Sequence, residues 1–514
     1  MHISVTRRAL LVFALHDRRH HPPTLKRATF SYLLTLALVC ALIFWVLRLG
    51  ASLPPPTGGT GAAASGSVAI TPRGAETASV FGVMGEGISR NLADPLSHLF
   101  LQLLIIIAVS RLMGKALSAL GQPSVIGEMA AGILLGPSLF GLLAPRAFAF
   151  IFPVSSFGTL TLLSQIGVCL FMFAVGMELN VNHVRDRAHT ALVVSHVSIV
   201  CPYLLGVALA YFLYSHLAAP GAAFTPFALF TGISMSITAF PVLARILQDR
   251  GLSRTLLGST AITCAAVGDV TAWIILAFVV AIARSSSVAG VGWVLLLVLV
   301  FIVLMIRGVK RALPRWIGAE RLAENEPSRG TLATVVCVVV ASSFCTQMIG
   351  IHALFGAFLA GAIMPEISGF REKLGVRVEN FSSVLLLPLF FAFTGLRTQI
   401  GLLNDLQGWL ICLAIIAVAT LGKLGGSAIA ARFTGMSWSD SLQLGALMNT
   451  RGLMELIALN IGYDLGILPP RIFTMLVIMA LATTAFTGPL LTLFGGKRTS
   501  LDEPAFVKGC EENQ

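Results

Sequence analysis

Charged side chains are scarce in this sequence of 514 residues, because Asp, Glu, Lys and Arg together make up 11% of it, whereas soluble globular chains carry about 25%. Hydrophobic residues make up 56%, and the mean hydropathy is +0.87. Apolar runs of roughly 20 residues recur along most of the chain, and each can cross a bilayer as a helix. The alternating segments of a membrane β-barrel, roughly 10 residues each, are missing. The sequence therefore predicts an all-α polytopic membrane protein.

Paired cysteines are lacking as well. Seven of the eight cysteines lie within apolar runs, and only Cys510 lies in a polar tail. No spacing among them indicates a metal site or a disulfide framework, so we interpret them as small hydrophobic residues and expect no cofactor. The net charge of +12 could suggest a nucleic-acid partner, but the basic residues are confined to short segments between the apolar runs. Membrane topology explains that distribution, and no nucleic acid is expected.

The chain divides by composition into five parts. Residues 1–27 form a basic N-terminus that is predicted to be cytoplasmic, and the apolar run 28–48 is predicted to be an extra transmembrane segment. A cleaved signal peptide is the alternative for this run, although signal cores are usually about 7–15 residues long. Residues 49–92 are rich in Gly, Ala, Pro and Ser, which is typical of a flexible linker, here external. Residues 93–496 form the transmembrane domain, and 497–514 form a short cytoplasmic tail.

Thirteen further spans are predicted after the linker. Lys and Arg alternate between crowded and sparse loops in this part, as cytoplasmic enrichment of positive charge requires; "NVNHVRDRAH" is crowded, whereas "SHLAAPGAAFTP" holds neither residue. The domain therefore starts outside and ends inside, which places the C-terminus in the cytoplasm, and we expect the membrane to be the cell inner (plasma) membrane. The predicted spans are 95–113, 123–141, 157–177, 189–215, 224–247, 255–283, 288–307, 332–348, 351–364, 381–399, 407–431, 441–462 and 470–494.

Two of these spans carry helix-breaking residues at matching places. Six spans precede the seventh and six follow it, an arrangement that favours an inverted repeat, and transporters with such repeats place discontinuous helices near the bilayer midplane. The fifth span contains "GISMSITAFPVLARIL" (232–247) and the twelfth contains "GALMNTRGLMELIALNIG" (445–462). The candidate break residues are Ser236, Thr238 and Pro241 in the first stretch, and Asn449, Thr450, Arg451 and Gly452 in the second.

Four ionisable residues fall deep inside predicted spans: Asp269, Lys423, Arg451 and Glu455. A charge at that depth costs at least about 2.5–3.5 kcal/mol, so each of these residues is expected to have a charge partner or a function. Burial and a nearby ammonium act in opposite directions on the proton affinity of a carboxylate, so Asp269 can titrate in the range of cellular pH. Such a group holds either a proton or, transiently, a dehydrated alkali cation, which makes it the candidate ion-binding residue. The alternative is a buried Asp269–Lys423 salt bridge that only fixes packing.

The other candidates also have structural alternatives. Lys423 is a charge partner either for Asp269 or for the carbonyl ends of broken helices, unless it extends to the interface. Arg451 and Glu455 are four residues apart and could simply satisfy each other. Ser236 and Thr238 offer oxygen atoms that suit a hard cation, or they only compensate for the proline break.

Several motifs occur together in a familiar order: "LGQPSVIGEMAAGILLGPSLFG", "FMFAVGMELN", "SMSITAFPVLARIL", "AAVGDVTAWIILA", "LFGAFLAGAIMPE", "LPLFFAFTGLRT", "LGKLGG" and "MNTRGLMELIALNIG". In these motifs the chain resembles the monovalent cation:proton antiporter-2 family, and is most similar to its cation/proton exchanger (sodium/hydrogen exchanger-like) branch. The resemblance implies a thirteen-span antiporter fold, a homodimer, and a mobile core with two crossed discontinuous helices. It places the acidic ion-binding position on Asp269 and the basic position of the eleventh span on Lys423.

The chain departs from the family pattern at one position. Electrogenic sodium exchangers of this family carry two adjacent aspartates, whereas here Gly268 precedes Asp269. With one exchangeable carboxylate, the simplest expectation is an electroneutral K+/H+ or Na+/H+ antiporter that works by alternating access. The alternative is a cation channel or ion sensor built on the same fold, although no filter-like motif is evident. No enzymatic motif appears, so a secondary transporter is expected and not an enzyme.

Overall fold

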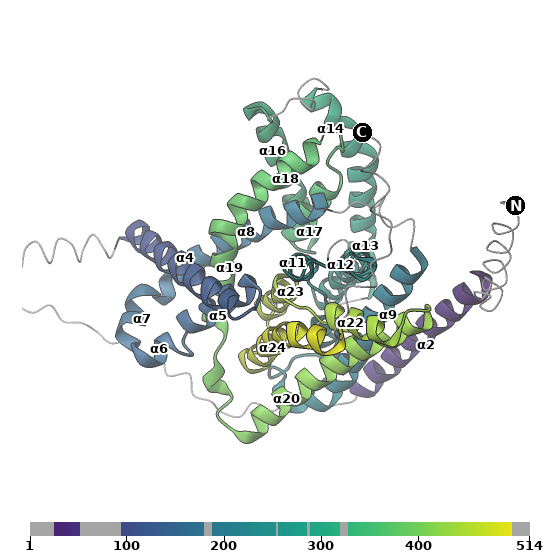
Figure 1. Cartoon of the computed structure of the whole chain (residues 1–514). Coiled ribbons are helices and arrows are strands. Elements are labelled where there is room, and N and C mark those ends of the chain that lie inside the picture. Colours follow the sequence, from purple (N-terminus) through teal and green to yellow (C-terminus); the bar gives the residue numbers. More distant parts are fainter. Residues whose placement is uncertain are drawn as a thin grey trace, which may run out of the picture.

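A computed structural model describes residues 25–51, 94–178, 188–252, 255–284, 288–318, 327–367 and 369–495. Within these ranges every regular element is a helix (Figure 1). The predicted linker 49–92 lies outside the described residues except for its first positions, and so do the basic N-terminus up to residue 24 and the predicted tail. The predicted all-α architecture is thus confirmed for the described part of the chain.

The first half of the domain consists of helices that correspond to spans one to six. They are α4 (Pro95–Ala119), α5 (Ser124–Leu135), α6 (Phe140–Leu143), α7 (Pro145–Ile151), α8 (Phe157–Glu178), α9 (Ala188–Leu217), α10 (Phe224–Ser234), α11 (Phe240–Asp249) and α12 (Leu256–Arg284). The linking seventh span consists of α13 (Val288–Val303), the π-helix η3 (Leu304–Val309) and α14 (Lys310–Ile317).

The second half repeats this order of long, short and broken helices. It consists of α16 (Arg329–Ile349), α17 (Ala353–Ala362), α18 (Phe370–Phe381), the π-helix η4 (Ser382–Leu386), α19 (Leu387–Arg397), α20 (Leu406–Thr420), the π-helix η6 (Leu421–Gly425), α21 (Gly426–Phe433), α22 (Trp438–Met448), α23 (Leu453–Asp464) and α24 (Pro470–Gly495).

Each of the thirteen predicted spans contains one or more of these helices, in the predicted order along the chain. Ten helical stretches in the described residues are long and apolar enough to cross a membrane. The three other predicted spans hold α10 with α11, α17, and α22 with α23, which are short or interrupted. The ends of the second span differ from the prediction 123–141, because α5 stops at Leu135 before the pair Gly136 and Pro137, and proline disfavours helix in the residue before it.

Helix packing follows the symmetry of an inverted repeat. The contact of α4 with α5 in the first half is matched by that of α16 with α17 in the second, and α9 against α12 is matched by α20 against α24. Across the halves, α5 packs on α19 while α17 packs on α8. At the first of these crossings, a Cβ on Gly395 would lie 1.9 Å from the carbonyl carbon of Gly132, so only glycine permits this approach. The predicted repeat is thus present in the packing.

The contacts divide the domain into two groups of helices. We call α4, α5, α8, α16, α17 and α19 the panel, since they pack mainly on one another, and α9, α10, α11, α12, α21, α22, α23 and α24 the core. In Figure 1 the core helices α11, α12, α22 and α23 lie near the middle of the view, with α4 and α5 toward the left. The extra helix α2 (Leu25–Gly50) packs against α9 and α10 of the core.

Candidate functional site

The interruptions of the fifth and twelfth spans meet inside the core. Helix α10 ends at Ser234 and α11 begins at Phe240, whereas α22 ends at Met448 and α23 begins at Leu453. We call 235–239 the first break and 449–452 the second break. The amide of Ala239 donates to the carbonyl of Thr450 at 3.0 Å. These two stretches are therefore in direct contact, as crossed discontinuous helices require.

Local sequence explains where the first break ends. Pro241 occupies the first turn of α11, where its missing N–H costs nothing, and it keeps the preceding residue out of helical geometry. The Thr238 hydroxyl donates to the carbonyl of Met448, at the end of α22, at 3.1 Å. The Ser236 hydroxyl donates to the Gly232 carbonyl at 2.8 Å. Both hydroxyls thus satisfy carbonyls that the breaks leave without helical partners, which is the structural role considered from the sequence.

Two buried cations stand at the carbonyl end of α10. Arg451 donates to the carbonyls of Ser234 at 2.9 Å and Met235 at 2.7 Å, and the ammonium of Lys423 donates to the carbonyl of Ser236. Both side chains are fully buried, so Lys423 does not extend to the membrane interface. Because the C-terminal end of a helix carries partial negative charge, both cations are stabilised there. Lys423 therefore compensates the carbonyl end of a broken helix, one of the two functions expected from the sequence.

Arg451 has a second partner. Its guanidinium lies 3.2 Å from a carboxylate oxygen of Glu455, and both side chains are fully buried. The pairing at four residues that the sequence suggested is therefore present, but it does not use the whole donor capacity of Arg451. The arginine joins its own helix α23 to the end of α10.

A π-turn and close glycine contacts set the position of Lys423. The residue lies in η6, between α20 and α21. A Cβ on Gly422 would lie 3.0 Å from the Cα of Pro202 on α9, and a Cβ on Gly426 would lie 3.0 Å from the Cβ of Cys201. Glycine at these positions lets the eleventh span approach α9 closely, since a larger residue would require the two helices to shift by a few tenths of an ångström. The periodicity of the sequence did not reveal the π-turn, which is typical of functional sites in membrane helices and elsewhere.

Asp269 lies on α12 beside both discontinuous helices. Its side chain is 3% exposed, and it borders a small space with Ile237 of the first break and Met454 at the start of α23, together with Trp273. This space leaves no room for a water molecule. The charge of Asp269 acts electrostatically on Lys423, as do those of Arg451 and Glu455. All four ionisable residues expected from the sequence thus come together.

Asn449 adds an unsatisfied polar group to the second break. Both polar atoms of its side-chain amide are buried without a hydrogen-bonding partner in the part of the chain that the structure describes, and the same holds for Oε1 of Glu455. An unsatisfied buried polar atom costs about 1–3 kcal/mol. Oxygen atoms left unused at a helix break are suitable ligands for a hard cation. The described residues contain no group of three or more His, Cys, Asp or Glu that could hold a metal ion.

The last span supports the second break, which sequence reasoning missed. The Thr484 hydroxyl of α24 accepts a hydrogen bond from the Arg451 amide at 2.9 Å, and its one proton is shared between the carbonyl of Arg451, at 2.9 Å, and that of Ala480 in its own helix, at 2.8 Å. The hydroxyl of Thr487 lies 3.4 Å from that of Thr450. The only signal in the sequence is the run "ATTAFTG" (482–488), in which threonines recur at helical spacing.

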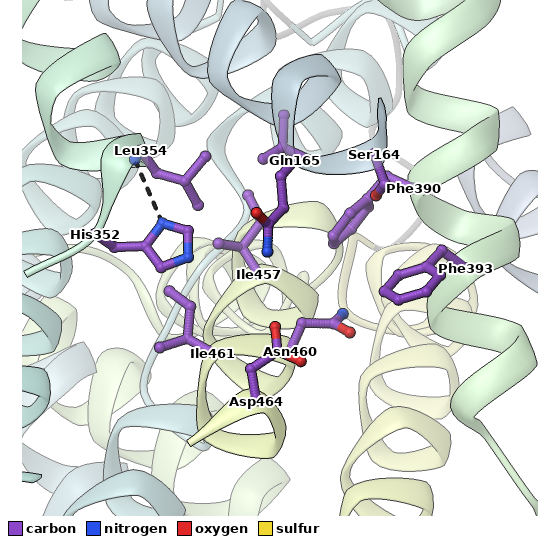
Figure 2. A pocket seen from close by; sticks show the side chains of 11 residues that line it. Ser164, Gln165, His352, Leu354, Phe390, Phe393, Ile457, Asn460, Ile461 and Asp464 are labelled. Atoms are coloured by element: carbon purple, nitrogen blue, oxygen red, sulfur yellow. Dashed lines mark hydrogen bonds between the residues drawn. The ribbon is translucent and has the colours of Figure 1, made fainter. Parts of the chain in front are cut away.

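A cavity of about 30 Å³ lies between the panel and α23, and both apolar and polar side chains line it. Figure 2 shows Gln165 of α8 and His352 on its walls, opposite Asn460 and Asp464 of α23. This volume is enough for about one or two water molecules. Helix α23, which begins at the second break, therefore borders the panel across this cavity along its second half.

Arg397 connects the panel to the core beside this cavity. Its guanidinium, at the end of α19, donates to the side-chain oxygen of Asn460 at 2.9 Å and lies 2.7 Å from a carboxylate oxygen of Asp464. It also lies over the ring of Phe393, 4.1 Å from the centroid. Arg397 is the last residue of α19, the position of a charge at the end of a span. Its contacts with α23 were not expected.

The fold and the site can now be compared with known proteins. The sodium proton antiporter MjNhaP1 from Methanocaldococcus jannaschii has a similar structure, with a TM-score of 0.53 at 14% sequence identity over 78% of this chain and 98% of that protein. This likeness shows an antiporter fold. Residues 104–495 match the family described as sodium/hydrogen exchanger, transmembrane, so the chain belongs to that family.

Curated relatives are similar at the level of sequence. The chain is 44% identical over 390 residues to the Na(+)/H(+) antiporter NhaS4 of Synechocystis, which covers 76% of this chain and 95% of the relative. It is 40% identical over 404 residues to cation/H(+) antiporter 17 of Arabidopsis thaliana, and 32% identical over 436 residues to K(+)/H(+) antiporter 1 of Saccharomyces cerevisiae. These matches cover 77% and 82% of this chain. The chain spans 49% and 50% of those two relatives.

Replacement of Thr484 by valine tests the support of the second break. Thr484→Val keeps the shape of the side chain but leaves the Arg451 amide buried without an acceptor, so we expect a loss of about 1–3 kcal/mol in stability. The measurement is the thermal unfolding midpoint of the purified protein in detergent. Thr334→Val is the matched control, because the hydroxyl of Thr334 bonds only the Gly330 carbonyl of its own helix. Equal midpoints for the two variants would contradict this role.

Proposed function

We propose that this chain is a secondary active antiporter that exchanges a monovalent cation, Na+ or K+, for a proton. The observation that carries the proposal is the position of Asp269, a buried carboxylate beside two crossed helix breaks and within electrostatic reach of Lys423. The names of the relatives support the same activity, since they describe Na+/H+ and K+/H+ antiporters. A transporter of this kind carries out no covalent chemistry, so the chain is not expected to be an enzyme.

The exchange follows from competition for one carboxylate. When Asp269 binds a proton, it is neutral and suits its dry surroundings. When it releases the proton, its charge must be balanced, and a dehydrated alkali cation can do so together with oxygen atoms of the breaks, such as Oδ1 of Asn449. Lys423 is already held by the Ser236 carbonyl, so it reduces the excess negative charge without occupying the place of the cation. The same carboxylate therefore binds either proton or cation, and neither crosses alone.

Alternating access requires the core to move relative to the panel. The arrangement supports this, because the breaks, Asp269 and Lys423 all belong to elements of the core or packed on it, while the panel forms a separate set of contacts. The closed surroundings of Asp269 leave no room for water, which favours an exchanger over the channel or sensor that the sequence left open. By analogy with the family resemblance, we also propose a homodimer in the cell inner membrane with its C-terminus in the cytoplasm.

Asparagine at position 269 provides the direct test. Asp269→Asn keeps size and polarity but binds neither an exchangeable proton nor a cation, so we expect cation-dependent proton movement in everted vesicles to fall to the background of vesicles without the protein. Asp94→Asn is the control, because Asp94 caps α4 with its side chain and asparagine caps a helix equally well. Wild-type activity in Asp269→Asn would refute the proposal, provided that both variants elute and unfold like the wild type.

Gly268 supports the proposed stoichiometry of one proton per cation. Position 268 faces the neighbouring helix α9, because a Cβ there would lie 3.3 Å from the Ser195 hydroxyl. Of the two adjacent positions 268 and 269, only 269 carries a carboxylate. Exchange of one proton for one monovalent cation moves no net charge.

Proteoliposomes with an imposed membrane potential test electroneutrality. A cycle that moves one net charge gains or loses about 2.3 kcal/mol per 100 mV, whereas a neutral cycle gains none. We therefore expect the same initial rate of cation-driven proton movement at zero potential and at either sign of an imposed potential. Empty liposomes control for passive leak. A rate that rises with one sign and falls with the other would show that a second charge, such as that of Lys423, takes part.

A further inference from the structure

The linking seventh span and α16 enclose an apolar groove of about 350 Å³. Phe301, Met305 and Trp316 line one side, and Val338 and Ala341 of α16 line the other. The residues that line the groove fall within 301–345 and are distant in sequence from both breaks. The proposed exchange assigns no function to this groove.

This groove opens toward lipid. Of the ten candidate spans, Ala289–Ile317 has the smallest buried share, 11%, and large apolar side chains such as Leu299 and Leu304 are 59% and 60% exposed. On α16, which forms the other wall, the neighbouring side chains of Val340 and Phe344 do not line the groove and are 61% and 64% exposed. Hydrocarbon chains of the bilayer therefore reach the groove directly.

Exposed basic side chains gather at one end of the same groove. Arg307, Lys310, Arg311 and Arg315 of η3 and α14 are all exposed, and Asp and Glu are absent from the whole stretch 288–318. Helix α14 contacts α16, which begins at the exposed Arg329. Trp316 lines the groove and directly follows Arg315 in the chain, and tryptophan prefers the level of lipid headgroups. The groove thus combines a place for an acyl chain with a cationic end.

We propose that this groove binds an anionic phospholipid, with one acyl chain between α13 and α16 and the phosphate on the basic side chains of α14. Basic pockets between membrane helices on the cytoplasmic side bind anionic headgroups, and the topology predicted from the sequence places α14 on that side. A second copy of this chain suits the surface less well. A twofold interface brings the same patch of both copies together, so the cations of α14 would face one another.

Native mass spectrometry of the purified chain with added phosphatidylglycerol or phosphatidylcholine tests this site. We expect wild type to retain phosphatidylglycerol in preference to phosphatidylcholine and to gain thermal stability from it. The double variant Arg311→Gln with Arg315→Gln should reduce the preference about tenfold or more. Arg111→Gln with Lys115→Gln is the matched control, because these exposed residues of α4 are also four apart and the topology predicted from the sequence places them on the same side as α14; it should leave the preference unchanged.

The apolar part has its own variant. Ala341→Trp fills the groove from an exposed position, so it should weaken retention of both lipids while the protein still unfolds cooperatively. Inorganic phosphate alone should give no stabilisation, since it lacks the acyl chain. The proposal is overturned if wild type retains both lipids equally, if the α14 double variant keeps the wild-type preference, or if Ala341→Trp changes only the oligomeric state.

Discussion

The structure depends on how the carbonyl groups of broken helices are satisfied inside a membrane. Hydrocarbon offers no hydrogen bonds, so a helix that stops at bilayer depth must find donors within the protein. Helix α10 finds them in Arg451 and Lys423, which come from two other spans. The end of α22 uses Thr238 of the opposite break. Each discontinuous helix is therefore completed by the other and by the eleventh span, and this mutual dependence holds the ionisable groups together.

That dependence has a consequence for the charge balance of the site. Arg451 carries a hydrogen-bonded counterion, Glu455, whereas the hydrogen bond of Lys423 goes to a neutral carbonyl. In the part of the chain that the structure describes, the positive charge of Lys423 faces the partial negative charge at the end of α10 and is influenced by the carboxylates of Glu455 and Asp269. Asp269 is the acidic group on α12 that acts on it. If Asp269 binds the ion, as proposed above, its protonation changes the electric field at the helix breaks, and ion binding is thereby linked to the core helices.

The sequence alone predicted the spans, the two breaks and the four buried ionisable residues, because a charge or a proline in an apolar run is conspicuous whatever surrounds it. It did not predict the hydrogen bonds of Thr484 to the second break. Threonines in membrane helices usually bond the carbonyls of their own turn, and the sequence does not show which of them lies beside a distant break. The bonds from Arg397 to Asn460 and Asp464 were missed for the same reason. The π-turns at Lys423 and in the linking span leave no periodic signal, since each displaces the helix by one residue only.

Arg397 shows how the panel takes part in the behaviour of the core. Its partners Asn460 and Asp464 lie on α23, the helix that starts at the second break and carries Glu455. Asn460 in turn donates to the hydroxyl of Thr394 on α19 at 2.8 Å, so two side chains of the panel hold one turn of this core helix. A displacement of the core along the panel must exchange these bonds for others or for water in the neighbouring cavity. Because α23 is a short, separate helix that starts at the second break, these bonds tie the panel to the same helix that carries Glu455, and the proposed movement of the core has to rearrange them.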